Sequence, residues 1–92
     1  MTNDEGEHNF RPEAGYVPDA ETAMTIAEAV WLPIYGTRVL EKRPLRARLV
    51  DDVWVVEGSL PRPPDGTVWA GGVPLAHISK RTDEILRISH GK

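Results

Sequence analysis

The spacing of apolar residues changes once along this chain, and the change limits the folds open to it. In the first half, apolar side chains recur three or four positions apart, at Ala23, Ile26, Ala27, Val30, Trp31 and Ile34. This is the spacing of one face of an α-helix. From residue 44 onward the spacing becomes two, as in strands with one buried face. The sequence therefore predicts an α+β domain whose sheet packs one face on a helix.

The predicted helix lies within VPDAETAMTIAEAVWLPIYG. Asp19 is placed to cap its N-terminus, and Val17 is placed to act as the apolar staple before the cap. Pro33 removes a backbone donor, so we expect it to kink or end the regular helix near residues 31–32. Gly36 then provides a C-terminal stop. A short helical turn is expected after it, at TRVLEK.

Four later segments, PLRARLV, VWVVEGSL, VPLAHISK and EILRISH, predict strands by their alternation and their β-branched residues. The first pair is joined by Asp51 and Asp52, and the last pair by RTD, both of which are turn signals. Prolines and glycines in PRPPDGTVWAGG interrupt any strand ladder, so this segment is predicted to be a long loop. The expected fold is one long N-terminal helix packed on a four-stranded antiparallel meander sheet.

Length, charge and composition exclude several classes of protein. The chain has 92 residues, which fits one domain at 16–92 after a polar tail at 1–15 that we expect to be disordered. Its net charge of -3 argues against a nucleic-acid partner. The absence of cysteine excludes disulfides and thiolate metal sites. No apolar run approaches the ~20 residues of a membrane span, and the acidic N-terminus is unlike a signal peptide. We therefore expect a cytoplasmic protein without a membrane partner.

Alternation divides the strand residues between two faces of the sheet. The face expected to pack on the helix comprises Leu45, Ala47, Leu49, Trp54, Val56, Ala76, Ile78, Leu86 and Ile88. The second face comprises Arg46, Arg48, Val53, Val55, Glu57, Leu75, His77, Ile85 and Arg87. Apolar and charged side chains are mixed on this second face, which favours recognition of a partner over a purely solvated surface.

Histidine, serine and aspartate near the C-terminus raise the question of catalysis. Alternation places His77 on the second face and His90 towards the helix at the sheet edge, while Asp83 lies in a turn. Ser79 and Ser89 lack the G-x-S-x-G setting of a nucleophile. These groups do not converge, so we predict no catalytic residue. We also predict no metal site and no cofactor, because neither ligand spacing nor a phosphate-binding glycine loop is present.

Trp69 lies in the loop of prolines and glycines and has no obvious place in the core. It is either an anchor of that loop or a binding residue, since aromatic residues are enriched at binding hot spots. Together with the second face it gives the predicted partner-binding residues: Arg46, Arg48, Val55, Glu57, Trp69, Leu75, His77 and Arg87.

Three segments in combination resemble a family of small bacterial immunity proteins: VPDAETAMTIAEAVWLPIYG, RPLRARLVDDVWVVEGSLP and GGVPLAHISKRTDEILRISHGK. These proteins have the nuclear-transport-factor-2-like (cystatin-like) fold and come from polymorphic toxin systems. The resemblance covers residues 15–92. It implies a helix wrapped by a curved antiparallel sheet, and a non-catalytic protein that binds and neutralises a cognate toxin. Full domains of this fold are longer and have more helices before the sheet.

Three functions remain open on the sequence. The leading one is an immunity protein that occludes a cognate protein toxin. The second is a small-molecule-binding or enzymatic domain with a pocket between helix and sheet, for which His77, His90 and Glu57 are the candidate polar groups. The third is an assembly module that dimerises through its sheet. We expect a monomer or a weak homodimer.

Overall fold

The computed structural model describes residue 10, residues 12–59 and residues 72–91. Its elements are α1 (Ala20–Tyr35), the 3-10 helix η2 (Thr37–Lys42), β1 (Arg46–Val50), β2 (Val53–Glu57), β3 (Pro74–Ser79) and β4 (Ile85–His90). The strands form one sheet in the order β1-β2-β3-β4, and every neighbouring pair is antiparallel. The predicted α+β order of one helix and four strands is confirmed.

The helix begins where the sequence predicts, and it continues past Pro33 to the predicted stop at Gly36. Asp19 is the N-cap, and its Oδ1 accepts a hydrogen bond of 2.8 Å from the Thr22 backbone N–H. The hydrogen bonds from Thr22 lower the pKa of the Asp19 carboxyl. Pro33 does not end the regular helix near residues 31–32, because α1 continues through it to Tyr35, and Gly36 is the C-cap, as predicted. One missing donor does not end this helix, which is closed by the Gly36 N–H donating to the Leu32 carbonyl at 2.8 Å.

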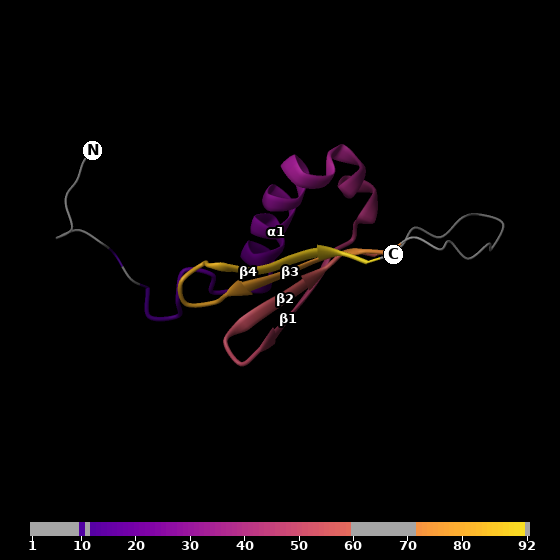
Figure 1. The fold of residues 1–92 in the computed structure, drawn as a ribbon. Helices are drawn as coiled ribbons and strands as arrows, with labels where there is room; N and C mark the ends of the chain where they lie inside the picture. Colours follow the sequence, from indigo (N-terminus) through magenta and orange to yellow (C-terminus); the bar gives the residue numbers. More distant parts are fainter. Residues whose placement is uncertain (1–9, 11, 60–71, 92) are drawn as a thin grey trace, which may run out of the picture.

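The helix lies across one face of the sheet, and together they make two layers (Figure 1). The core between them consists of Val17, Ala23, Ala27, Trp31, Val39, Trp54, Val56, Ala76 and Ile78. Both core tryptophans satisfy their indole N–H groups on backbone carbonyls. Trp54 Nε1 donates to the Val17 carbonyl at 2.7 Å, and Trp31 Nε1 donates to the Leu75 carbonyl at 3.3 Å. These bonds tie the segment just before α1 to β2, and the second half of α1 to β3.

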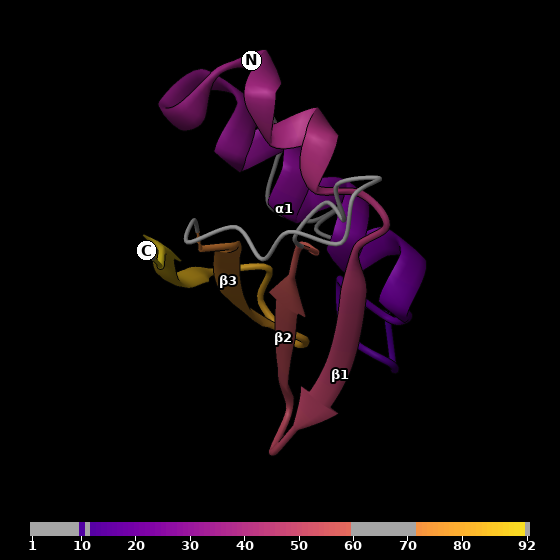
Figure 2. The ribbon, with the colours of Figure 1, turned by 90° about the vertical axis from the view of Figure 1, so that its right-hand side faces the viewer.

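The turn between β1 and β2 has the backbone conformation that a tight hairpin requires. Asp51 and Asp52 have φ of 51° and 64°, so both occupy the left-handed region used by two-residue hairpin turns. Val50 and Val53 flank the turn as paired residues. Figure 2 shows this turn projecting away from α1. Leu49 next to it is 45% exposed, so the expectation that Leu49 packs against the helix is wrong.

A bulge changes the register of β4. His77 pairs with Arg87, but Ile78 pairs with Ile85, so Leu86 is an extra residue in β4. One inserted residue reverses the alternation beyond it. Ile85, expected on the second face, therefore lies opposite the buried Ile78, and Leu86, expected in the core, is 47% exposed.

Candidate functional site

The sheet face turned away from α1 is not covered by any described helix or strand (Figures 1 and 2). We call it the open face and define it by Arg46, Arg48, Val53, Val55, Glu57, Leu75, His77, Ser79, Arg87 and Ser89. The strand register arranges eight of these residues in two rows across all four strands. The first row is Arg46–Glu57–Leu75–Ser89, and the second row is Arg48–Val55–His77–Arg87.

Exposure follows a simple pattern along the second row. Val55 and His77, on the two central strands, are half-buried, whereas Arg48 and Arg87, on the two edge strands, are exposed. Neighbouring side chains shield the centre, and the long cations at either end remain in solvent. Val55 gives the centre apolar surface and His77 gives it an aromatic ring, and a charged margin around such a centre is common at protein-binding surfaces.

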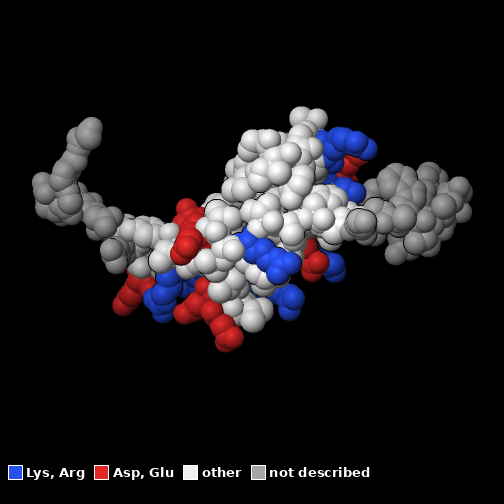
Figure 3. All heavy atoms as spheres, in the orientation of Figure 1, with Lys and Arg blue, Asp and Glu red and all other residues white. Residues whose placement is uncertain are grey.

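The arginines of the open face differ in their partners. Arg46 lies 3.9 Å from Glu57, and the Arg46 side chain is 72% exposed, so this pair contributes little to stability. Arg48 and Arg87 form no ion pair within the described residues. Figure 3 shows charged side chains of both signs over the sheet, while the visible surface of α1 carries few. The guanidinium groups of Arg48 and Arg87 can each bind a carboxylate with two hydrogen bonds.

His90, another candidate polar residue, lies outside the two rows of the open face. His90, at the end of β4, makes an edge contact with the Tyr35 ring at 5.1 Å between centroids. Its Nδ1 lies 2.9 Å from the Gly91 carbonyl, which accepts a hydrogen bond from it. His77, His90 and Glu57 therefore do not converge on a common pocket. Trp69 lies outside the described residues.

The serine and aspartate of the C-terminal hairpin have structural positions. Ser79 Oγ accepts a hydrogen bond of 3.2 Å from the Thr82 backbone N–H. Asp83 has a φ of 69° in the same turn, and its N–H donates to the Ser79 carbonyl at 3.0 Å. Neither residue forms a hydrogen bond with His77 or His90. These contacts hold the turn that joins β3 to β4.

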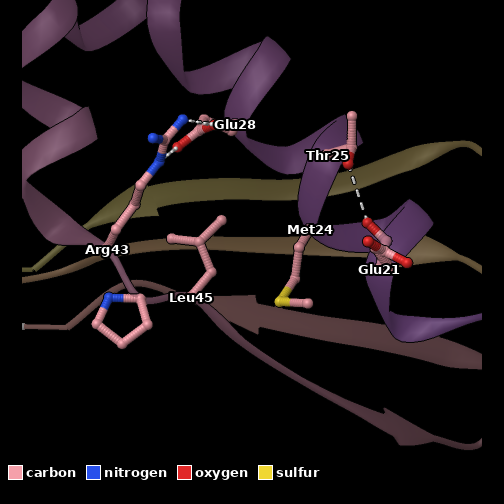
Figure 4. A pocket seen from close by; sticks show the side chains of 7 residues that line it. Glu21, Met24, Thr25, Glu28, Arg43 and Leu45 are labelled. Carbon is pink, nitrogen blue, oxygen red and sulfur yellow. Dashed lines mark hydrogen bonds and ion pairs between the residues drawn. The ribbon is translucent and has the colours of Figure 1, made fainter.

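A hollow of about 580 Å³ lies on the other side of the molecule, beside α1. It is lined by Glu21, Met24, Thr25, Glu28, Arg43, Pro44 and Leu45 (Figure 4). Arg43 closes one wall with two hydrogen bonds of 2.8 Å to Glu28. The hydrogen bonds from Arg43 hold the pKa of Glu28 below its usual range, and Glu28 raises that of Arg43.

A second hollow of about 430 Å³ continues from the first, because both include Met24 and Leu45. It is lined by Ala20, Met24, Leu45, Arg46, Ala47, Arg48, Val55 and Glu57. The sequence left open a pocket between helix and sheet, with His77, His90 and Glu57 as its polar groups, but of these three only Glu57 lines either hollow. One residue in the sequence could have indicated these hollows. Met24 is apolar and lies next to the buried stripe of Ala23 and Ala27, yet no strand residue was expected to pack against it.

The described residues contain neither a cluster of metal ligands nor a membrane-spanning helix. Among the described residues, no three histidine, aspartate or glutamate side chains gather where a metal ion would bind. Nor does any helix in the described part of the chain have the length and apolar character needed to cross a membrane.

Comparison with known proteins identifies a family. The model of a family described as NTF2 fold immunity protein matches residues 22–92, from the first turn of α1 to the C-terminus. The chain belongs to this family, which confirms the expected family and its NTF2-like fold. Comparisons with curated proteins and with solved structures give no match.

Proposed function

We propose that this member of the NTF2 fold immunity protein family binds a cognate toxin protein through its open face. Binding neutralises the toxin by occlusion, and this chain catalyses no reaction. The proposal places the protein in the bacterial cytoplasm, where it meets a toxin that enters or is made there.

The row Arg48–Val55–His77–Arg87 is the observation that supports this proposal most. Its half-buried centre offers an apolar and aromatic platform, and its ends offer two cations without a partner among the described residues. A toxin surface with an apolar side chain between two carboxylates would match it. Charges at the margin steer association and select the partner, while the centre supplies most of the affinity.

The size of the open face suits such a complex. A standard interface buries about 800 Å² on each partner. Two rows across four strands, together with the neighbouring Val53 and Ser79, form a continuous surface for the central part of such an interface. Occlusion needs no bond-making group, and the proposal assigns none to this chain.

Co-expression tests the proposal. The candidate to test is the product of the reading frame next to this protein's gene. Cells that produce the toxin should survive with the wild-type protein and die without it. The Arg48→Glu, Arg87→Glu double variant should lose protection, while the matched variant Arg38→Glu, exposed on η2, should keep it. Equal killing with and without the wild-type protein would show that it is not the immunity partner of that toxin.

A further inference from the structure

The outer edge of β1 has main-chain groups that no described strand pairs. Among the described strands, β1 lies at one end of the sheet and pairs with β2 alone (Figure 2). Val50 and Val53 close a two-residue turn, so they exchange both of their main-chain hydrogen bonds. Bonded and non-bonded pairs alternate along an antiparallel ladder. Ala47 and Leu49 therefore direct their N–H and C=O groups outward, away from β2.

The two sides of this edge differ in chemistry. Arg46 and Arg48 extend from β1 on the open face, and both are exposed. Leu45, Ala47 and Leu49 lie on the side of α1. The hollow of about 430 Å³ is lined by residues of both sides, Arg46 and Arg48 together with Leu45, Ala47 and Met24 of α1. The hollow therefore extends around the free edge of the strand.

We propose that this edge binds an extended segment of the toxin as a fifth strand of the sheet. This inference rests on the proposed function and names a second contact for the same partner. An added strand alternates its side chains between the two faces, as strands do. Its residues beside Arg46 and Arg48 are acidic, and its residues beside Ala47 and Leu49 are apolar and enter the hollow next to Met24.

The positive charges of β1 favour a toxin segment over a second copy of this chain as the added strand. If two copies paired antiparallel through β1 with Ala47 opposite Ala47, Arg46 of each copy would lie opposite Arg48 of the other. Like charges directly opposite destabilise a strand pair. Charged side chains on an edge strand also protect it against self-association. The same arginines attract a strand with acidic residues, so the edge discriminates between the two occupants.

Synthetic peptides probe the edge directly. One fluorescent peptide, about seven residues long as a typical strand is, alternates glutamate with valine, and a second alternates lysine with valine. The wild-type protein should bind the glutamate peptide and not the lysine peptide, as measured by fluorescence anisotropy. Equal binding of the two peptides, or binding of neither, would overturn the proposal.

A proline substitution separates the main-chain contact from side-chain effects. Leu49→Pro removes an outward N–H that β2 does not use, a position that edge strands tolerate. Leu49→Ala is the matched control, because it shortens the same side chain and keeps the N–H. Leu49→Pro should weaken binding of the glutamate peptide about tenfold relative to Leu49→Ala, from the lost hydrogen bond and the blocked edge. Equal binding by the two variants would contradict strand addition.

Two more measurements cover the cases in which Leu49→Pro does not fold or the edge pairs with a second copy of the chain. If Leu49→Pro does not fold, amide exchange on the wild-type protein replaces it. The glutamate peptide should then slow exchange at Ala47 and Leu49, and unchanged exchange at both would overturn the proposal. A mass of two chains in solution, seen for Leu49→Ala and lost in Leu49→Pro, would assign the edge to a second copy and also overturn it.

The toxin distinguishes failure of this inference from failure of the proposed function. If the wild-type protein neutralises the toxin and Leu49→Pro binds it as tightly as Leu49→Ala does, the edge is not a contact and the proposed function stands. If the wild-type protein fails to neutralise the toxin, the proposed function fails, whichever peptide binds.

Discussion

His77 of β3 lies directly opposite Arg87 of β4, immediately before the bulge that shifts the rest of this hairpin. The pair forms one half of the row that ends at Arg48 on the far edge strand. Because the bulge comes after this pair, it leaves the row intact and redirects only the start of β4. The open face thus keeps a regular arrangement where the proposed function needs it.

The margin of the open face should control the rate of toxin association. Arg87→Gln and Arg48→Gln remove exposed charges without reversing them, so each should slow association and change dissociation less. The salt dependence of the association rate should also become weaker. Surface plasmon resonance at several salt concentrations measures both rates. Arg38→Gln on η2 is the control, and an equal slowing in this variant would mean that net charge, not the open face, is responsible.

The two tryptophan hydrogen bonds should differ in their contributions to stability. Trp54→Phe removes a buried bond of 2.7 Å to the Val17 carbonyl, and Trp31→Phe removes a longer one of 3.3 Å to the Leu75 carbonyl. We expect Trp54→Phe to lower the free energy of unfolding by about 1 kcal/mol more than Trp31→Phe does, because it leaves a buried acceptor unpaired. Urea unfolding measures the difference. A larger loss in Trp31→Phe would contradict the assignment of the shorter bond as the stronger one.

The turn between β1 and β2 should tolerate glycine in place of Asp52. Asp52 has a φ of 64°, a conformation that costs an L-residue about 1 kcal/mol and glycine almost nothing. Asp52→Gly also loses an exposed contact of 3.3 Å to Arg81, which is worth little. We expect a net gain of about 0.5 kcal/mol in unfolding free energy, measured by thermal or urea denaturation. A clear loss would indicate that the aspartate side chain, not its backbone, determines the turn.

The ion pair beside α1 should make stability depend on pH. Hydrogen bonds from Arg43 lower the pKa of Glu28 in the folded protein. The stabilisation is therefore fully present above the pKa of an unfolded glutamate and is lost as the pH falls through the lowered folded value. Glu28→Gln should unfold at lower urea than the wild-type protein at neutral pH. The two midpoints should converge in acid, and a difference that persists there would contradict this linkage.

The sequence predicts the elements of this fold because their signals are local. Asp19 caps the helix at the expected position, and alternation correctly assigns Trp54 and Ile78 to the core. The register of β4 could not be predicted in this way. The extra residue Leu86 depends on how the preceding turn closes, with Ser79 accepting hydrogen bonds from two backbone N–H groups.

Long-range contacts explain what else the sequence did not reveal. The hollow beside α1 depends on Glu28 and Arg43, which lie fifteen positions apart and meet only after η2 turns the chain back. Pro33 favours a helix end by its local chemistry, and packing of the buried Trp31 opposes that tendency. The rows of the open face could be predicted only in part. Alternation predicts which residues lie on this face, but the strand register is needed to know which of them are neighbours across the strands.

Methyl cross-saturation in solution tests the central claim most directly. The immunity protein is deuterated and methyl-labelled, the toxin is protonated, and saturation passes only to methyl groups at the interface. The account predicts saturation of Val55 and Leu75 on the open face, with the exposed Ile34 of α1 unaffected. Saturation of Ile34 without Val55 or Leu75 would place the toxin on the helix and contradict the account.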